Sequence, residues 1–237
     1  MTARSFNLDT EAAKQANSGG KRITESGKYI GTIKSAWHET YPSGAEAVLL
    51  KFDSDQGQEA GPLMLFTHGK DGNTLSGYNT VQALMTCVKA RSLTPRPGQV
   101  ELYDFDQQKE VMKQKDTYPE LTGKRVGLLL REEHVTDQQG YPKTRDDGSI
   151  KTRMILFAPF CAETERTAAE VLEKVQQGSQ LERMVQWLAE NPVKAAKKAP
   201  MSHDPRQQSP QQGQAAQGSY QNPPASAYDD LDDEIPF

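Results

Sequence analysis

The chain has 237 residues, of which 35% are hydrophobic and 25% charged, and its formal net charge is −4. This composition is polar for a fully globular chain, so we expect part of its length to stay unfolded. It contains no apolar run long enough to span a membrane and begins without a signal-peptide pattern, which predicts a cytoplasmic protein. Cys87 and Cys161 lie in apolar stretches without metal-site spacing, so we expect buried thiols in a reducing compartment.

The first two thirds of the chain are predicted to be a flexible arm followed by a β-rich domain. Residues 1–22 are polar and contain Gly19-Gly20, which is typical of a loosely ordered arm. Residues 23–162 form short runs separated by turn signals, which favours a β-barrel or a β-sandwich. The expected strands are 27–38, 46–53, 62–68, 99–105, 109–115, 124–133 and 150–157.

Helices are predicted within and after this β-rich domain. One is inserted at 77–91, where apolar residues recur at helical spacing: Val81, Leu84, Met85 and Val88. Two more form a short extension at 163–192, the second opened by a Ser179–Glu182 capping box and stopped at Pro192. These helices either pack on the β-rich domain or mediate self-association, and the sequence leaves both open.

The rest of the chain is predicted to be a disordered linker that ends in an acidic tip. Residues 193–228 are rich in Gln, Pro, Ala, Ser and Gly, and such a segment buries too little apolar surface to offset the entropy of ordering it. The tip, residues 229–237, holds five acids and no base, so the rest of the chain carries one net positive charge. The overall charge therefore does not exclude a local basic surface that binds nucleic acid.

The tip has the chemistry of a segment that docks on partner proteins. The terminal ring and α-carboxylate suit an apolar pocket rimmed by Arg or Lys, and the preceding acids supply long-range attraction. The predicted partner-binding residues are Asp229, Asp230, Asp232, Asp233, Glu234, Ile235, Pro236 and Phe237. The alternative is an acidic solubilising tail, although such a tail has little reason to end on three apolar residues.

Two parts of the sequence resemble known protein families. The tip sequence Asp-Asp-Glu-Ile-Pro-Phe is similar to the tip of bacterial single-stranded DNA-binding proteins, and in that family the tip recruits replication and repair enzymes. The linker before it is also similar to theirs. The core instead resembles a family of phage-encoded single-stranded DNA-binding proteins, through GKYIGTIK at 27–34, LMTCVKARSLTP at 84–95 and YPELTGKRVG at 118–127. This resemblance implies a mainly β fold, an OB-like barrel with an inserted helix, and a role in phage DNA replication, recombination or repair in the cytoplasm of a bacterial host.

We expect the chain to coat single-stranded DNA, which requires cations along the DNA backbone and flat rings on which bases stack. The predicted DNA-binding residues are Lys34, Trp37, Phe66, Lys70, Tyr78, Arg131, Tyr141, Lys143, Arg145, Lys151 and Arg153. Strand alternation favours exposure of Phe66, whereas Trp37 fits a stacking platform and a core residue equally well. The loop 137–149 joins two expected strands and carries a ring and two cations, although an ordinary polar hairpin has the same composition.

Signatures of an enzyme are weak. Gly72 and Gly77 have phosphate-loop spacing but lack the Lys-Ser/Thr pair that follows it, and the four histidines are too scattered for a zinc site. Asp53 with Asp55, or Asp104 with Asp106, have the composition of a two-metal nuclease site, but aspartates are common at turns. We therefore expect no enzyme, no cofactor and no metal. Two other functions remain open: an adaptor that recruits host replication proteins through the tip without binding DNA, and a barrel protein that binds single-stranded RNA.

Overall fold

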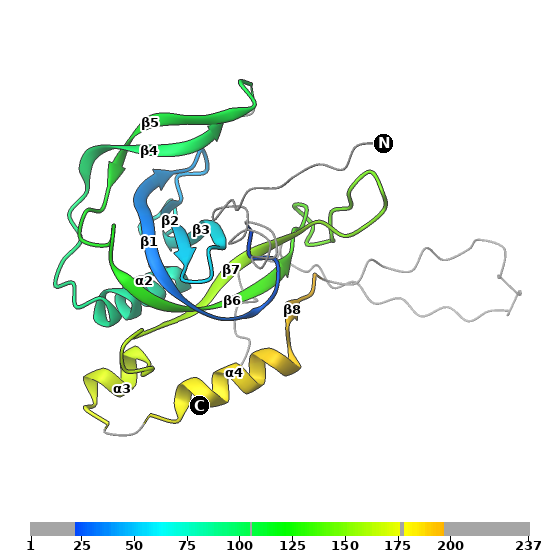
Figure 1. Ribbon diagram of the computed structural model, residues 1–237. Helices are drawn as coiled ribbons and strands as arrows, with labels where there is room; N and C mark the ends of the chain where they lie inside the picture. Colours follow the sequence, from blue (N-terminus) through cyan, green and yellow to red (C-terminus); the bar gives the residue numbers. More distant parts are fainter. Residues whose placement is uncertain (1–21, 105, 176–177, 197–237) are drawn as a thin grey trace, which may run out of the picture. The chain divides into compact units, whose positions relative to one another are not determined.

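The computed structural model describes residues 22–104, 106–175 and 178–196, which form a mainly β fold with one eight-stranded sheet and few helices (Figure 1). The expected arm up to residue 21, the linker from 197 and the acidic tip lie outside the described residues. No helix among the described residues is both long and apolar enough to cross a membrane.

Each strand expected from the sequence is present, with bounds that differ at the ends. The elements in chain order are β1 (Gly27–Thr40), β2 (Glu46–Ser54), β3 (Glu59–His68), α2 (Ser76–Cys87), β4 (Arg96–Asp104), β5 (Lys109–Thr117), β6 (Arg125–His134), β7 (Thr152–Phe160), α3 (Ala168–Leu172), α4 (Gln180–Glu190) and β8 (Val193–Lys194). The inserted helix ends at Cys87 rather than at 91, since Lys89 adopts a φ of 58° that stops an α-helix.

The long strand β1 organises the sheet, because it pairs with different neighbours along its length. The strand order is β3-β2-β1-β5-β4, and β6 pairs with both β1 and β7. A register shift between Ile33 and Ser35 divides β1, so that residues 27–32 pair with β6 while Trp37 pairs with Thr117 of β5. Among the described residues no ladder joins β3 to β7, so the sheet is not closed there.

The main core lies on one face of the β1–β2–β3 meander. Alternate residues of β2, Val48, Leu50 and Phe52, point into it, as the period of a strand requires. The helix α2 covers this face with Val81 and Leu84. Both cysteines are buried here as free thiols, as expected from their apolar surroundings.

A close backbone contact fixes the first turn of α2 against β3. A Cβ atom added at Gly77 would lie 2.3 Å from the carbonyl oxygen of Phe66. Only glycine permits this approach. The start of α2 is therefore held directly beside the C-terminal half of β3.

The opposite face of the meander carries a second apolar cluster, which the β4–β5 hairpin covers (Figure 1). Its buried members are Trp37, Ala47, Leu49 and Val100. Three ion pairs join the hairpin to the sheet: Lys115–Glu39 at 2.6 Å, Lys51–Glu110 at 3.2 Å and Lys34–Glu101 at 3.7 Å. The side chain of Trp37 is a core residue with 1% exposure, so its ring has no face on which a base could stack, and its predicted role in DNA binding is wrong.

The C-terminal part of the described chain is a strap formed by α4 and β8. Leu181 and Leu188 of α4 pack on Leu129 and Phe160 of the sheet, so this helix packs on the β-rich domain. The short strand β8 pairs in parallel with β6, and the hydroxyl of Ser26 donates to the carbonyl of Pro192. Residues 193–196, which were predicted to belong to the linker, are therefore part of the folded strap.

The predicted capping box at Ser179 is wrong, since this side chain makes no capping hydrogen bond. The capping box lies at α3 instead, where Thr167 and Glu170 bond each other's backbone amides. The carboxylate of Glu170 also accepts from the backbone N–H of Gln180 at 2.8 Å. It is thus already committed to the turn that connects α3 to α4.

Candidate nucleic-acid interface

Aromatic side chains line the C-terminal half of β3, on the face that carries the second apolar cluster. The rings of Tyr41 and Phe66 lie with their centroids 5.2 Å apart and their planes tilted by 45°. The hydroxyl of Tyr41 donates to the sulfur of Met64 at 3.2 Å, which holds the Tyr41 ring over the strand. Phe66 is half-buried while its neighbour Leu65 is buried, so the partial exposure predicted from strand alternation is confirmed.

The same row continues to the end of β3 and onto α2. His68 meets the ring of Tyr78 edge-on at a centroid distance of 5.7 Å, and Tyr78 remains 37% exposed. Beyond β3, a Cβ atom added at Gly44 would lie 2.9 Å from the Cβ of Lys70, so the exposed Lys70 lies against the β1–β2 turn. Phe66, Tyr78 and Lys70, which were predicted separately, thus belong to one stretch of surface.

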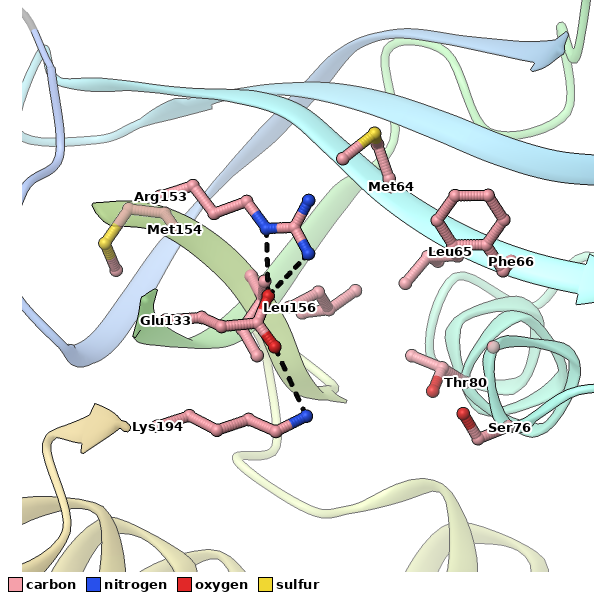
Figure 2. A pocket seen from close by; sticks show the side chains of 12 residues that line it. Met64, Leu65, Phe66, Ser76, Thr80, Glu133, Arg153, Met154, Leu156 and Lys194 are labelled. Carbon is pink, nitrogen blue, oxygen red and sulfur yellow. Dashed lines mark hydrogen bonds and ion pairs between the residues drawn. The ribbon is translucent and has the colours of Figure 1, made fainter. Parts of the chain in front are cut away.

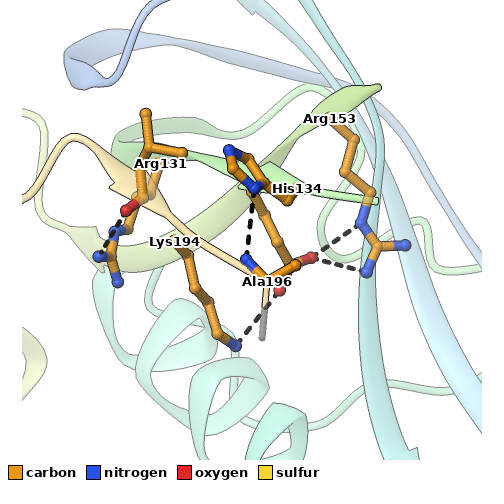
Figure 3. Close-up of polar contacts among 7 residues, drawn as sticks. Arg131, His134, Arg153, Lys194 and Ala196 are labelled. Carbon is orange, nitrogen blue, oxygen red and sulfur yellow. Dashed lines mark hydrogen bonds and ion pairs between the residues drawn. The ribbon is translucent and has the colours of Figure 1, made fainter. Parts of the chain in front are cut away.

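Two cations lie across from this row, fixed by one carboxylate (Figures 2 and 3). Glu133 of β6 accepts hydrogen bonds from Nε and Nη2 of Arg153 at 2.8 and 2.6 Å, and it pairs with Nζ of Lys194 at 3.2 Å. The Glu133 side chain is 15% exposed, compared with 44% for Arg153 and 48% for Lys194. The group therefore presents its positive charge to solvent and keeps its negative charge inside.

Arg153 also acts on the aromatic row. Burial and the negative charge of Glu39 raise the pKa of Tyr41, and the positive charge of Arg153 opposes them. Phe66 and Arg153 also line one cavity. Ring and cation are thus adjacent, as binding of a single strand requires.

A cavity of about 200 Å³ separates the aromatic row from the cations (Figure 2). Met64 and Phe66 of β3 form one wall, and Arg153 and Leu156 of β7 form the other. The first turn of α2 contributes Ser76, Gly77 and Thr80. The cavity therefore occupies the place where β3 and β7 are not paired.

The long β6–β7 loop, residues 135–151, folds into two successive turns. The backbone N–H of Val135 donates to the carbonyl of Lys151, that of Lys151 to Lys143, and that of Lys143 back to Val135. Each turn is closed by an aspartate: Asp137 accepts from the N–H groups of Gln139 and Tyr141, and Asp147 accepts from Ser149. The loop is therefore held together by its own backbone.

The cations predicted in this loop reach solvent. Lys143, Arg145 and Lys151 are exposed, and Tyr141 is half-buried. Hydrogen bonds from the Ser149 hydroxyl and backbone lower the pKa of Asp147, which keeps a negative charge near Arg145. The loop thus offers solvent-exposed cations, with acids that moderate their field.

Two further predicted residues do not belong to this surface. Lys34 lies at the other end of the sheet; burial lowers its pKa, but Glu59, Asp53, Glu101 and Glu110 outweigh this and raise it. That acidic surrounding would repel phosphate. Arg131 is committed to the strap, since its guanidinium donates to the carbonyls of Asn191 and Val193 at 3.0 and 3.3 Å. Arg131 therefore has a structural role in holding the strap.

Lys194 and Glu133 are members of the site that the sequence prediction missed. Lys194 was assigned to the linker, because a strand of two residues leaves no periodic pattern. The backbone N–H of Ala196 donates to Nδ1 of His134 at 3.3 Å, which fixes the strap at this point (Figure 3).

One aspartate of each pair considered for a nuclease, Asp55 and Asp104, has structural partners. Asp55 accepts two hydrogen bonds from Arg125, at 2.8 and 2.6 Å. Asp104 accepts from the backbone N–H groups of Asp106 and Gln107, and it pairs with Lys113 at 3.0 Å. Within the described ranges, no group of three or more His, Cys, Asp or Glu side chains is placed to hold a metal ion.

The sequence matches no protein-family model and no curated protein. Its function is therefore inferred from the geometry of this surface.

Proposed function

We propose that the protein binds single-stranded DNA without sequence preference and coats it during DNA replication, recombination or repair, in a phage that infects bacteria. The observation that carries this proposal is the Tyr41–Phe66 ring pair at a cavity that Phe66 and Arg153 both line. Bases stack on such rings whatever their identity, because every base has a π-face, and cations follow the phosphates. The exposed cations of Lys70 and of the β6–β7 loop add to the positive charge available to phosphates.

The fold proposed with this function is an OB-like barrel. In OB folds, oligonucleotides bind the face of strands 2 and 3 between the loop that joins strands 1 and 2 and the loop that joins strands 4 and 5. We equate β1, β2, β3, β6 and β7 with the five strands and β4–β5 with an inserted hairpin. The aromatic row then lies on the ligand face, between the turn at 41–45 and the loop at 135–151.

The acidic tip has a separate part in the proposal. The tip lies outside the described residues. Five acids before an apolar end fit a pocket rimmed by cations on a replication, recombination or repair enzyme. The coated strand would then be handed to an enzyme bound at the tip, and the protein itself performs no catalysis.

Fluorescence anisotropy of labelled oligo-dT, titrated with the full chain at several salt concentrations, tests the proposal. We expect tight binding that weakens as salt rises and that duplex competitor does not displace. A matched RNA that binds better than DNA would indicate an RNA-binding protein. Absence of binding to either at low salt would contradict the proposal and favour an adaptor that acts through the tip alone.

The same assay tests the ring pair. Phe66→Leu keeps apolar bulk over the second cluster but removes the flat ring, so oligo-dT affinity is expected to fall about 5- to 150-fold, the equivalent of one base stack. Met112→Leu is the control, because Met112 is 58% exposed on the β4–β5 hairpin and outside the aromatic row. Equal affinities for the two variants would remove Phe66 from the binding surface.

A further inference from the structure

The cavity between β3 and β7 contains groups that are not needed for stacking bases on the aromatic row. Its walls are apolar at Met64 and Leu156, and its rim carries Arg153 and Lys194. Hydroxyl groups of Ser76 and Thr80 line the side formed by α2 (Figure 2). Apolar walls, hydroxyls and paired cations in one opening match the three parts of a nucleotide: the faces of a base, its polar edge and its phosphate.

The cations at the rim are held in position before any ligand arrives. Glu133 lies between them, binds both and itself lines the cavity, with its side chain 15% exposed, so the three groups together carry one net positive charge. The outer guanidinium nitrogen of Arg153 and the ammonium of Lys194 remain available to a second anion, since an Arg side chain has five N–H donors and a Lys side chain three. A phosphate placed there would find two cations at a fixed spacing.

The size of the cavity limits its occupant. At about 200 Å³ it is smaller than the usual pocket for a drug-sized ligand, and it suits one base rather than a stack. Hydroxyl groups both donate and accept hydrogen bonds, so Ser76 and Thr80 tolerate the polar edge of any base. The opening also adjoins the Tyr41–Phe66 pair, because Phe66 belongs to both.

We propose that this cavity takes one nucleotide out of the bound strand, with its base between β3 and β7 beside the first turn of α2, and its phosphate on Arg153 and Lys194. The inference rests on the proposed single-strand binding and adds a fixed position of the DNA strand relative to the protein. One base per protein leaves the stack of its neighbours, while the adjacent bases lie on the aromatic row. The site selects a flipped nucleotide without selecting a sequence.

The test uses 2-aminopurine, whose emission is quenched while it stacks between neighbouring bases. The shortest oligo-dT that binds with full affinity is prepared as a series, with 2-aminopurine at each position in turn. We expect the emission to rise several-fold on binding at one position and to change little at the others. An abasic residue at that same position should lower affinity on the order of tenfold.

Two variants on α2 locate the effect. Thr80→Phe places a ring in the cavity, whereas Gln82→Phe adds the same ring to an exposed position two residues away on α2. Thr80→Phe should abolish the position-specific rise, and Gln82→Phe should keep it. Thermal unfolding followed by circular dichroism shows whether both variants are folded. The 2-aminopurine series is first measured with the unaltered protein, so that result does not depend on any variant.

The outcomes separate this inference from the proposed function. If the unaltered protein binds oligo-dT but 2-aminopurine responds equally at all positions, the nucleotide site is overturned and single-strand binding stands. A position-specific rise that persists in folded Thr80→Phe also overturns it, since the unstacked base then lies elsewhere. If no oligonucleotide binds at all, the proposed function fails and this inference fails with it.

Discussion

Arg153 and Arg125 form similar ion pairs in different surroundings. Each binds an aspartate or glutamate through two hydrogen bonds, Arg153 to Glu133 and Arg125 to Asp55. The acid beside Arg153 is largely buried and shared with Lys194, whereas Asp55 is 45% exposed and pairs with Arg125 alone among the ion pairs of the described residues. A phosphate approaching Arg153 therefore meets a net positive group, and one approaching Arg125 meets a neutral pair.

This difference predicts unequal effects on DNA binding. Arg153→Gln should weaken oligo-dT binding and reduce the slope of log affinity against log salt by about 0.7, the value for one phosphate contact on a single strand. Arg125→Gln removes the same charge and should leave the slope unchanged. Anisotropy titrations between low and moderate salt measure both slopes, and equal slopes for the two variants would count against a phosphate contact at Arg153.

Among elements, the connection between α3 and α4 depends on one carboxylate. Burial raises the pKa of Glu170, but hydrogen bonds from the backbone of Gln180 and from Thr167 outweigh it, so the pKa is lowered. A Cβ atom added at Gly178 would lie 2.6 Å from an oxygen of this carboxylate, which shows how closely the connection wraps it. The charged form of Glu170 therefore stabilises the folded state.

Glu170→Gln should lower the free energy of unfolding by about 2 kcal/mol at neutral pH, because hydrogen bonds to a charged acceptor are lost. A lowered pKa gives stability above the ordinary glutamate value of about 4.3, and this stability disappears as the pH falls through the folded pKa. The difference between variant and parent should therefore shrink on acidification. Urea unfolding at several pH values measures it, with the exposed Glu173→Gln as control; a difference independent of pH would contradict the charge-based explanation.

Elements differ in how far their sequence predicts them. The strands follow from short runs bounded by turn signals, and α2 follows from the spacing of Val81 and Leu84, because a long buried face leaves a pattern. The Ser179 capping box has the required residues, but the side chain of Ser179 is not used. Strand β8 is defined by its partner β6 and by Ser26, both distant in sequence, so no local pattern indicates it.

At the scale of the whole molecule, the mainly β architecture was predictable and the site only in part. Phe66, Tyr78, Lys70 and Arg153 come together around β3 and β7. The surroundings of Trp37, Lys34 and Arg131 depend on elements that the sequence does not place: the β4–β5 hairpin that buries Trp37, the acids around Lys34, and the strap that Arg131 binds. Burial and local charge are properties of the assembled fold, so the sequence pattern of one β-strand does not reveal them.

The charge distribution of the whole chain predicts that the acidic tip competes with DNA for the proposed DNA surface. The tip carries five acids, and the proposed DNA surface carries cations. Replacing the five acids of 229–237 by Ser or Asn, or deleting these residues, should tighten oligo-dT binding at low salt and have little effect at high salt, where charge is screened. Unchanged affinity at low salt, measured by anisotropy, would show that the tip and the DNA surface act independently.

Trp187 has an unusual setting within the strap. Its ring stacks on Phe157 at 5.2 Å, nearly parallel, and the guanidinium of Arg131 lies 4.7 Å from its centre. The only other tryptophan in the sequence, Trp37, is enclosed beneath the β4–β5 hairpin. The protein therefore contains two native optical reporters: release of α4 would hydrate Trp187 and shift its emission to the red, while Trp37 would change only when the β4–β5 hairpin opens or the sheet unfolds.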